Sequence, residues 1–211
     1  MKILEIKELE IPSIKVIKFA RFCDHRGYFT EPFRRSQFTD EIPFMKDVNF
    51  LQANESYSKS GVIRGLHFQW NPFMGKLVRT VQGRMVDLFL DIRKGSPTYG
   101  KLSAYEMESR PDMDHSDWIW IPPGFAHGNY FSEDSTIEYF CSGEYSPGCE
   151  AGISPLSSDI DWSLCPEELK KEFSSLSRNT DLMTEKDING FTLEKWAEDS
   201  RSQNFIYEDL K

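Results

Sequence analysis

The sequence predicts an all-β sandwich or barrel followed by a helical tail. Before about residue 165, short runs rich in β-branched and aromatic residues recur between turn signals, as in KLVRTVQG, RMVDLFLDIRKGSP and DWIWIPPG, a pattern typical of all-β folds. After that point the periodicity becomes helical. Because domains commonly span about 100–200 residues, we expect one β domain over residues 1–165 and a tail over 166–211.

The clearest predicted strand covers residues 85–92. One face carries Val86, Leu88, Leu90 and Ile92. The other face carries Asp87, Phe89 and Asp91. Alternation with period two is typical of a strand whose faces meet different environments. An aromatic residue between two carboxylates fits either a wet surface or the polar lumen of a barrel.

Two segments carry the helical signal of the tail. PEELKKEF places Pro166 ahead of a charged run, as at the first turn of a helix. GFTLEKWAEDS spaces Phe191, Leu193 and Trp196 at near-helical intervals. The acidic residues of the tail are interpreted as a solvated face.

Composition limits the possible partners and compartment. A net charge of −9 argues against nucleic acid or an anionic membrane as a partner, because a negative field repels phosphates. No apolar run approaches the roughly 20 residues of a membrane span, and MKILEIKELEIP lacks the apolar core of a secretion signal. We therefore expect a cytoplasmic protein. Four reduced thiols are expected, because no CxxC or Cys/His pairing joins Cys23, Cys141, Cys149 and Cys165.

Polar side chains that could act chemically gather in four stretches. DHRGYFTE (24–31) contains Arg26 and Glu31, whose simplest interpretation is a surface ion pair. Residues 51–80 contain Gln52, Asn54, Arg64, His67, Gln69, Lys76 and Arg79. IPPGFAHGNYF (121–131) contributes His127, and residues 135–152 contribute Tyr139, Tyr145 and Glu150. These stretches are consistent with a polar site inside a small β-barrel.

His67, in RGLHFQ, has three possible roles: a packed core residue, a metal ligand or a catalytic base. Arg64 and His67 would face opposite sides of an ideal strand, so a bulge or a twist is needed to bring both into one cavity. Gly65 makes that bulge plausible. Metal binding is disfavoured, because Gln69 occupies the position two residues on and no glutamate follows four residues later. We therefore expect no metal.

Several segments, in order, resemble the dTDP-4-dehydrorhamnose 3,5-epimerase family. They are RGYFTE, NESYSKSGVIRGLHFQ, GKLVRTVQG, VDLFLDIRKGSPTYG, WIPPGFAHG and EYFCSGEYSPGCEAGI…DIDW. The similarity runs from about residue 19 to Trp162, and several spaced motifs in register are a specific signal. The resemblance implies a double-stranded β-helix, the cupin jelly-roll barrel. It also implies a homodimeric isomerase that acts on a nucleotide-diphosphate sugar without metal or organic cofactor.

The resemblance also implies a role for each candidate residue. His67 matches the base that removes a proton next to the C4 ketone, and Tyr139 matches the acid on the opposite face. Lys76 matches the cation that stabilises the enolate oxygen. Arg26 and Arg64 match diphosphate and sugar contacts, and Tyr145 matches an aromatic residue stacked on the nucleotide base. The remaining matches are polar contacts or further binding positions, at Glu31, Gln52, Asn54, His127 and Glu150. Arg26 and Glu31 are candidates for reaching across a dimer interface.

One family feature is displaced in this sequence. Family members orient the base histidine with an aspartate in a motif like Leu-Ser-x-Lys-Asp beyond the conserved tryptophan. The stretch LSRNTDLMT (176–184) lacks the lysine and places Asp181 one position late, and we assign Asp181 as the orienting carboxylate. The chain also extends further after Trp162 than typical members, and we expect FTLEKWAEDSRSQNF to form an extra helix on the barrel or dimer.

Alternatives remain open at this point. The chain could epimerise only C3 or only C5, or act on another 4-keto sugar, including one carried on CDP. A related cupin class moves the ketone between C3 and C4, but it lacks the RGLHFQ and GFAHG spacing. A non-catalytic cupin that binds nucleotide sugars would keep the arginines and lose the acid/base pair. The presence of both His67 and Tyr139 favours an enzyme.

Overall fold

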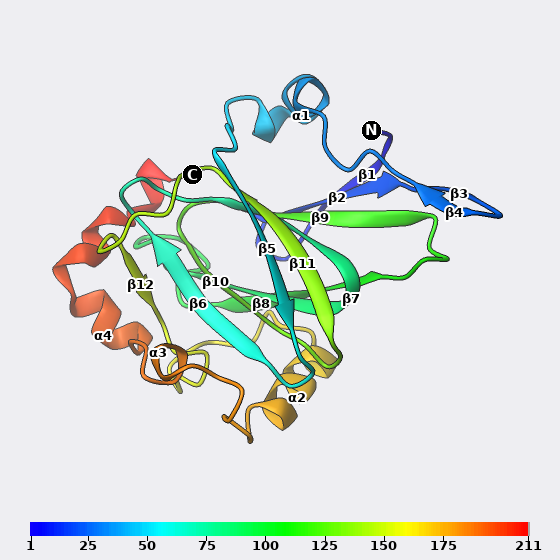
Figure 1. Ribbon diagram of the computed structural model, residues 1–211. Coiled ribbons are helices and arrows are strands. Elements are labelled where there is room, and N and C mark those ends of the chain that lie inside the picture. The colour runs from blue at the N-terminus through cyan, green and yellow to red at the C-terminus, as the bar shows by residue number, and fades with distance from the viewer. Residues whose placement is uncertain (211) are drawn as a thin grey trace.

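One long strand, β7 (Lys76–Asp91), belongs to both sheets of the computed structural model, which describes residues 1–210 (Figure 1). Its first half pairs with β11 (Ser135–Cys141) and β9 (His115–Ile121). Its second half pairs with β10 (Phe125–Tyr130) and β8 (Leu102–Ser109). The two sheets are therefore joined through a continuous backbone and enclose a barrel.

Other strands extend these two sheets and add a separate hairpin. The first sheet is extended by β1 (Ile3–Glu8), β2 (Lys15–Ala20) and β5 (Gln52–Ser58). The second is extended by β6 (Ile63–Gln69) and β12 (Glu150–Gly152). A hairpin of β3 (Phe22–Asp24) and β4 (Gly27–Phe29) projects from the body of the molecule (Figure 1). This is the double-sheet barrel that the sequence predicted.

Gly83 marks the point where β7 passes between the sheets. Pairing with β11 ends at Gln82, and pairing with β8 begins at Gly83. The φ angle of Gly83 is +89°, and a Cβ there would lie 2.4 Å from Ser135 Oγ. Glycine is therefore required at this corner, because other residues rarely adopt that φ and have no space for a side chain.

The alternation predicted for residues 85–92 separates the interior of the barrel from its outer face. Phe89 packs inside with Val78 and Ile119, and Asp87 is fully buried. The opposite face carries Val86, Leu88, Leu90 and Ile92, which pack with apolar side chains of the tail. Of the two environments that the sequence left open for the Asp87 face, the structure shows the barrel lumen and not a wet surface, and both faces of β7 are buried here.

The tail winds along one side of the barrel (Figure 1). Its helices are α2 (Glu167–Leu176), α3 (Glu185–Ile188) and α4 (Leu193–Glu198), with short 3-10 turns at Ser200–Asn204 and Tyr207–Asp209. Two of the helices were predicted, whereas α3 was not. The predicted extra helix packs on the barrel, because Trp196 of α4 is fully buried with its ring 4.7 Å from that of Phe68. The last residue of the predicted tail, 211, lies outside the described residues.

The remaining helical elements lie near the N-terminus. Helix α1 (Arg35–Glu41) and a 3-10 turn at Pro43–Met45 bury Phe38 and Met45 against the first sheet.

The four cysteines are free thiols, as expected. Among residues 1–210, no helix has both the length and the apolar character needed to cross a bilayer.

We expect Trp196→Ala to lower the free energy of unfolding by about 3–5 kcal/mol, because it leaves a cavity in a shared core. Urea denaturation measures this change. Lys195→Ala is the matched control from the same helix, since Lys195 is exposed, and we expect it to change stability by less than about 0.5 kcal/mol. Equal effects of the two variants would show that the tail is not part of the barrel core.

Candidate active site

Two adjoining cavities between the sheets share His67, Lys76 and Tyr139 as lining residues. One cavity, of about 310 Å³, extends toward Arg64, His127, Asn129 and Asp187; we call it the Arg64 cavity. The other, of about 430 Å³, extends toward Gln52, Asn54, Tyr145 and Glu150; we call it the Tyr145 cavity. The three residues predicted as base, cation and acid therefore lie where the two cavities meet.

A bulge in β6 brings Arg64 and His67 to the same cavity. His67 pairs with His127 and Arg64 pairs with Asn129, so three residue steps on β6 oppose two on β10. Gly65, with φ +109°, lies so close to β10 that a Cβ would be 2.5 Å from Gly128 Cα. Of the bulge and the twist that the sequence allowed, the bulge is therefore present, and only glycine fits at its centre.

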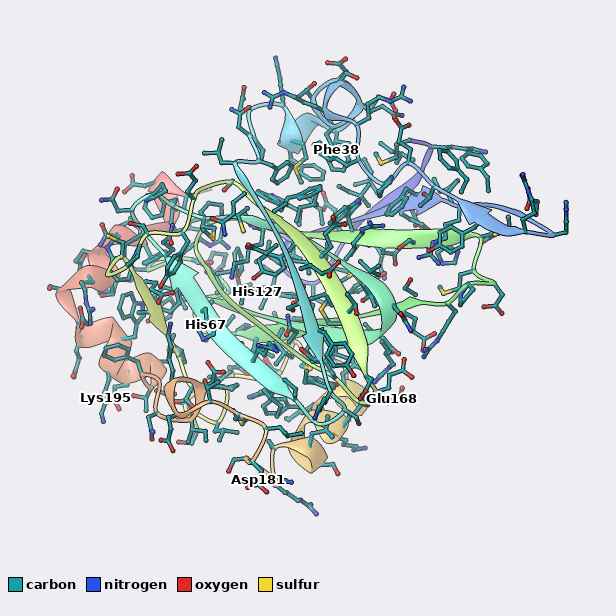
Figure 2. The ribbon with its side chains drawn as sticks, viewed as in Figure 1. Phe38, His67, His127, Glu168, Asp181 and Lys195 are labelled. Atoms are coloured by element: carbon teal, nitrogen blue, oxygen red, sulfur yellow. The ribbon has the colours of Figure 1, made fainter. Side chains whose placement is uncertain are left out.

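A buried aspartate supports His67, but it is Asp187 and not Asp181. The Nε2 atom of His67 lies 2.6 Å from Asp187 Oδ1, and the Asp187 side chain is 4% exposed. Asp181 is exposed, and its amide donates to Asn179 Oδ1 instead. Figure 2 shows Asp181 at the edge of the molecule, away from His67. The assignment of Asp181 as the orienting carboxylate was therefore wrong.

The sequence did contain the signal for Asp187. The family motif Leu-Ser-x-Lys-Asp aligns in register with Met-Thr-Glu-Lys-Asp at 183–187, with methionine in place of leucine and threonine in place of serine. Thr184 caps α3 by accepting from the Asp187 amide, a role that serine and threonine share. Matching by physical role would have found both Lys186 and Asp187.

The surroundings of Asp187 keep it ionised. Burial by itself would raise the pKa of this carboxyl, but hydrogen bonds from His67 and Thr184 and the charge of His67 bring the pKa below its usual range. An ionised aspartate fixes the tautomer of its histidine and increases its basicity. The second ring nitrogen of His67 is thereby left to act on a bound molecule.

A second histidine–aspartate pair lies deeper in the barrel. His127 Nε2 is 2.5 Å from Asp87 Oδ1, and both side chains are buried. Burial lowers the pKa of His127, and the Asp87 carboxylate only partly offsets that effect. His127 is therefore favoured as a neutral imidazole. Asp87 was not predicted as a site residue, although a lumen position was one of the two environments considered for its face.

Tyr139 and Lys76 face His67 from the other sheet. His67 is on β6 of the second sheet, whereas Tyr139 and Lys76 are on β11 and the first half of β7. Burial raises the pKa of Tyr139, which keeps its proton at neutral pH. Burial lowers the pKa of Lys76, and Asp87 and Glu150 act against that shift. A basic group and a protonated phenol thus oppose each other across one space.

Hydrogen bonds pre-arrange the wall of the Tyr145 cavity. Gln52 accepts from the Tyr145 amide at 2.8 Å and donates to Asn54 Oδ1 at 3.0 Å. Glu150 Oε1 accepts from both Tyr145 Oη and Lys186 Nζ, at 3.1 and 2.8 Å. The ring of Tyr145 is 54% exposed and thus has a free face for stacking.

Gln69, two residues after His67 on the same strand, is engaged with the backbone. Its Nε2 donates to the carbonyls of Pro72 and Glu144, and its Oε1 accepts from the Ser146 amide. Within residues 1–210, no three or more His, Cys, Asp or Glu side chains are grouped so as to hold a metal ion.

Arg26 and Glu31 line neither cavity of the described chain. Arg26 is at the tip of the β3–β4 hairpin and pairs with Asp24 at 2.6 Å. Glu31 pairs with Arg34 and with the amino terminus. The other predicted residues, apart from Asp181, all line one or both cavities.

Comparison with known proteins agrees with this arrangement. The family model described as dTDP-4-dehydrorhamnose 3,5-epimerase matches residues 8–198. A dTDP-4-dehydrorhamnose 3,5-epimerase of Shigella flexneri is 35% identical over 191 residues, which cover 89% of this chain and 94% of that protein. The chain belongs to the dTDP-4-dehydrorhamnose 3,5-epimerase family. It is an enzyme of the isomerase class, a carbohydrate epimerase.

Solved structures of other family members share its fold. The enzyme from Sulfolobus tokodaii is 37% identical with a TM-score of 0.72, and the match covers 92% of this chain and 97% of that one. The dTDP-6-deoxy-D-glucose-3,5-epimerase of Legionella pneumophila, in complex with dTDP-4-keto-L-rhamnose, is 30% identical with a TM-score of 0.74, over 90% and 93% of the two chains. The predicted cupin jelly-roll fold is thus confirmed.

We expect Asp187→Asn to lower kcat by about 100-fold or more, because the amide can no longer fix the tautomer of His67 or stabilise its charged form. Asp181→Asn is the matched control, and its kcat should stay within about 2-fold of the wild type, as for other exposed positions. Epimerase assays of both variants, with melting curves to verify folding, measure the difference. A large loss in Asp181→Asn with none in Asp187→Asn would reverse the assignment.

Proposed function

We propose that the enzyme inverts C3 and C5 of a dTDP-linked 4-keto-6-deoxy sugar of the dTDP-4-dehydro-6-deoxyglucose type. The observation that carries this proposal is the arrangement of His67, supported by Asp187, opposite Tyr139, with Lys76 beside both. Inversion at carbon needs a base on one face of the sugar and an acid on the other. The two sheets supply one group each.

The chemistry follows from the C4 ketone. Its carbonyl acidifies the hydrogens on C3 and C5, so His67 can remove one of them as a proton and become an imidazolium. The C–H electron pair then forms the enolate, whose negative oxygen is stabilised by Lys76. Tyr139 donates its proton to the opposite face of the carbon and becomes a phenolate. Proton exchange with solvent restores His67 and Tyr139, and the same pair acts at the second carbon.

The two cavities can divide the rest of the substrate. Tyr145, with its exposed ring, stacks on the nucleotide base in the Tyr145 cavity, where Gln52, Asn54 and Glu150 supply polar contacts. Arg64 offers a planar cation for the diphosphate and sugar. His127, held neutral with its Nε2–H donating to Asp87, keeps Nδ1 as a further hydrogen-bond acceptor for the sugar. Local cations of this kind suffice for binding an anion to an acidic protein.

Incubation with dTDP-4-keto-6-deoxyglucose in D2O, followed by NMR, tests the reaction. We expect deuterium at both C3 and C5 with inverted products. In His67→Asn we expect exchange to fall by about 100-fold or more, because the proton-abstracting group is lost. In Tyr139→Phe we expect exchange to continue with retained configuration, since His67 can return a deuteron to the face from which it took the proton.

The other outcomes separate the alternatives. Exchange at only one carbon selects a C3-only or C5-only epimerase. Exchange only when CDP replaces dTDP selects a CDP-linked sugar as the substrate. Tight nucleotide-sugar binding without exchange at either carbon contradicts the epimerase proposal and selects a non-catalytic binding role. As a control, both variants should bind dTDP within about 3-fold of the wild type, because neither residue contacts the base in this proposal.

We further propose a homodimer in which Arg26 and Glu31 complete the partner's substrate site. The β3–β4 hairpin that carries Arg26 projects from the barrel (Figure 1) and exposes Phe22, Tyr28 and Phe29. Exposed apolar side chains gathered on one arm are typical of an interaction surface. The arm lies outside its own cavities, so the site of a second copy is the place where these two residues could act.

Mixed dimers test this arrangement directly. A dimer of one Arg26→Ala chain and one His67→Ala chain contains one site with both His67 and a partner-derived Arg26. If Arg26 acts across the interface, mixing two inactive homodimers should restore up to half of the wild-type activity per dimer, since one of the two sites is intact. Light scattering establishes that the mixed species is a dimer. Activity that stays absent in an isolated mixed dimer would place Arg26 in its own site.

A further inference from the structure

Asn129 is a buried polar residue that neither the predicted site nor the proposed mechanism uses. It lies on β10 two residues after His127, so both side chains point to the same face of the strand. It lines the Arg64 cavity and is 5% exposed. Within the described chain, its side-chain oxygen Oδ1 is buried without a hydrogen-bond partner.

The polar residues opposite Asn129 in the sheet are engaged elsewhere. Its register partners are Arg64 on β6 and Asp87 on β7. The Arg64 guanidinium donates to Ser58 Oγ at 2.9 Å and to the Tyr57 carbonyl at 3.3 Å. Asp87 accepts from His127 through Oδ1, and its Oδ2 is buried without a hydrogen-bond partner, so neither carboxylate oxygen donates to Asn129. A buried amide oxygen beside a cavity is destabilising unless something in the cavity donates to it.

We propose that Asn129 is a specificity-determining residue whose amide oxygen accepts a hydrogen bond from a ring hydroxyl of the substrate sugar. This inference rests on the proposed function, because that function places the sugar at His67. The ketone oxygen and the ionised diphosphate offer only acceptors, and the nucleotide base is assigned to the other cavity. The hydroxyls on C2 and C3 are the donors closest to the reacting carbons.

This hydrogen bond would make the enzyme discriminate between substrate sugars by their hydroxyl groups. A site built to hydrogen-bond a hydroxyl discriminates strongly against an analogue that lacks it, because the buried acceptor is again left without a partner. Asn129 therefore favours sugars that keep the contacted hydroxyl over their deoxy counterparts.

The test compares the wild type with Asn129→Leu on three dTDP-linked substrates: 4-keto-6-deoxyglucose and its 2-deoxy and 3-deoxy counterparts. Deuterium exchange at C5 is the readout, because all three sugars have that carbon. We expect the variant to lower kcat/KM for the parent sugar by about 10- to 100-fold. For the deoxy sugar that lacks the contacted hydroxyl, kcat/KM should already be low with the wild type. The variant should lower that kcat/KM by less than about 2-fold further.

Two controls separate a specificity role from a structural one. Thr136→Val exchanges a hydroxyl for a methyl on β11, outside both cavities, and should leave all three rates within about 2-fold, as for most such surface changes. The dTDP affinity of Asn129→Leu should match that of the wild type, because dTDP lacks the 4-keto hexose that Asn129 is proposed to contact. The melting temperature of the variant should also match that of the wild type.

The remaining results overturn the inference. An equal loss on all three substrates, with a shifted pH profile, would show that Asn129 acts by supporting the Asp87–His127 pair. No loss on any of them would show that it does not contact the sugar. If the wild type exchanges deuterium into none of the three sugars, the proposed function itself fails. That result is distinguishable from the two preceding ones, because in each of them the wild type exchanges deuterium into the parent sugar.

Discussion

The passage of β7 from one sheet to the other at Gly83 is the constraint on which the site depends. The first half of the strand places Lys76 next to β11, which carries Tyr139, and the second half places Asp87 beside His127 on β10. Because one covalent strand supplies both groups, the distance between the two walls of the cavity is fixed by backbone geometry. The corner needs a residue without a side chain, so a glycine that lines neither cavity sets the spacing of the side chains that do.

The tail has a second role that links stability to catalysis. It covers the apolar outer face of β7 with Trp196, Phe173 and their neighbours, and it also supplies Asp187 to a histidine 120 residues earlier in the chain. Helix α3 has only four residues and cannot hold a position by itself. Its place is set by the packed segments on either side of it, so the orientation of His67 depends on the core formed by barrel and tail together.

The sequence predicted much of this architecture, and its failures have physical causes. The alternation at residues 85–92 fitted either a wet surface or a barrel lumen, and the structure has the lumen. The spacing of Arg64 and His67 required a bulge or a twist, and the structure has a bulge at Gly65. Asp181 was chosen because it follows the letters Leu-Ser, whereas the structure uses Thr184 as the cap and Asp187 as the partner. Local pattern could not show that Asp87 pairs with His127, because that contact depends on strand register. Nor could it show that Arg26 lies on an arm outside its own cavities.

The origin of Asp187 in the tail also has a consequence for the order of events during synthesis. Ribosomes release the chain from its N-terminus, and domains form as their segments emerge. Every strand of the barrel has been made by Gly152, together with both histidines, Lys76 and Tyr139. The carboxylate that activates His67 follows only after α2. The strands that line both cavities are therefore made before the carboxylate that contacts His67, and that contact forms only once the tail has docked.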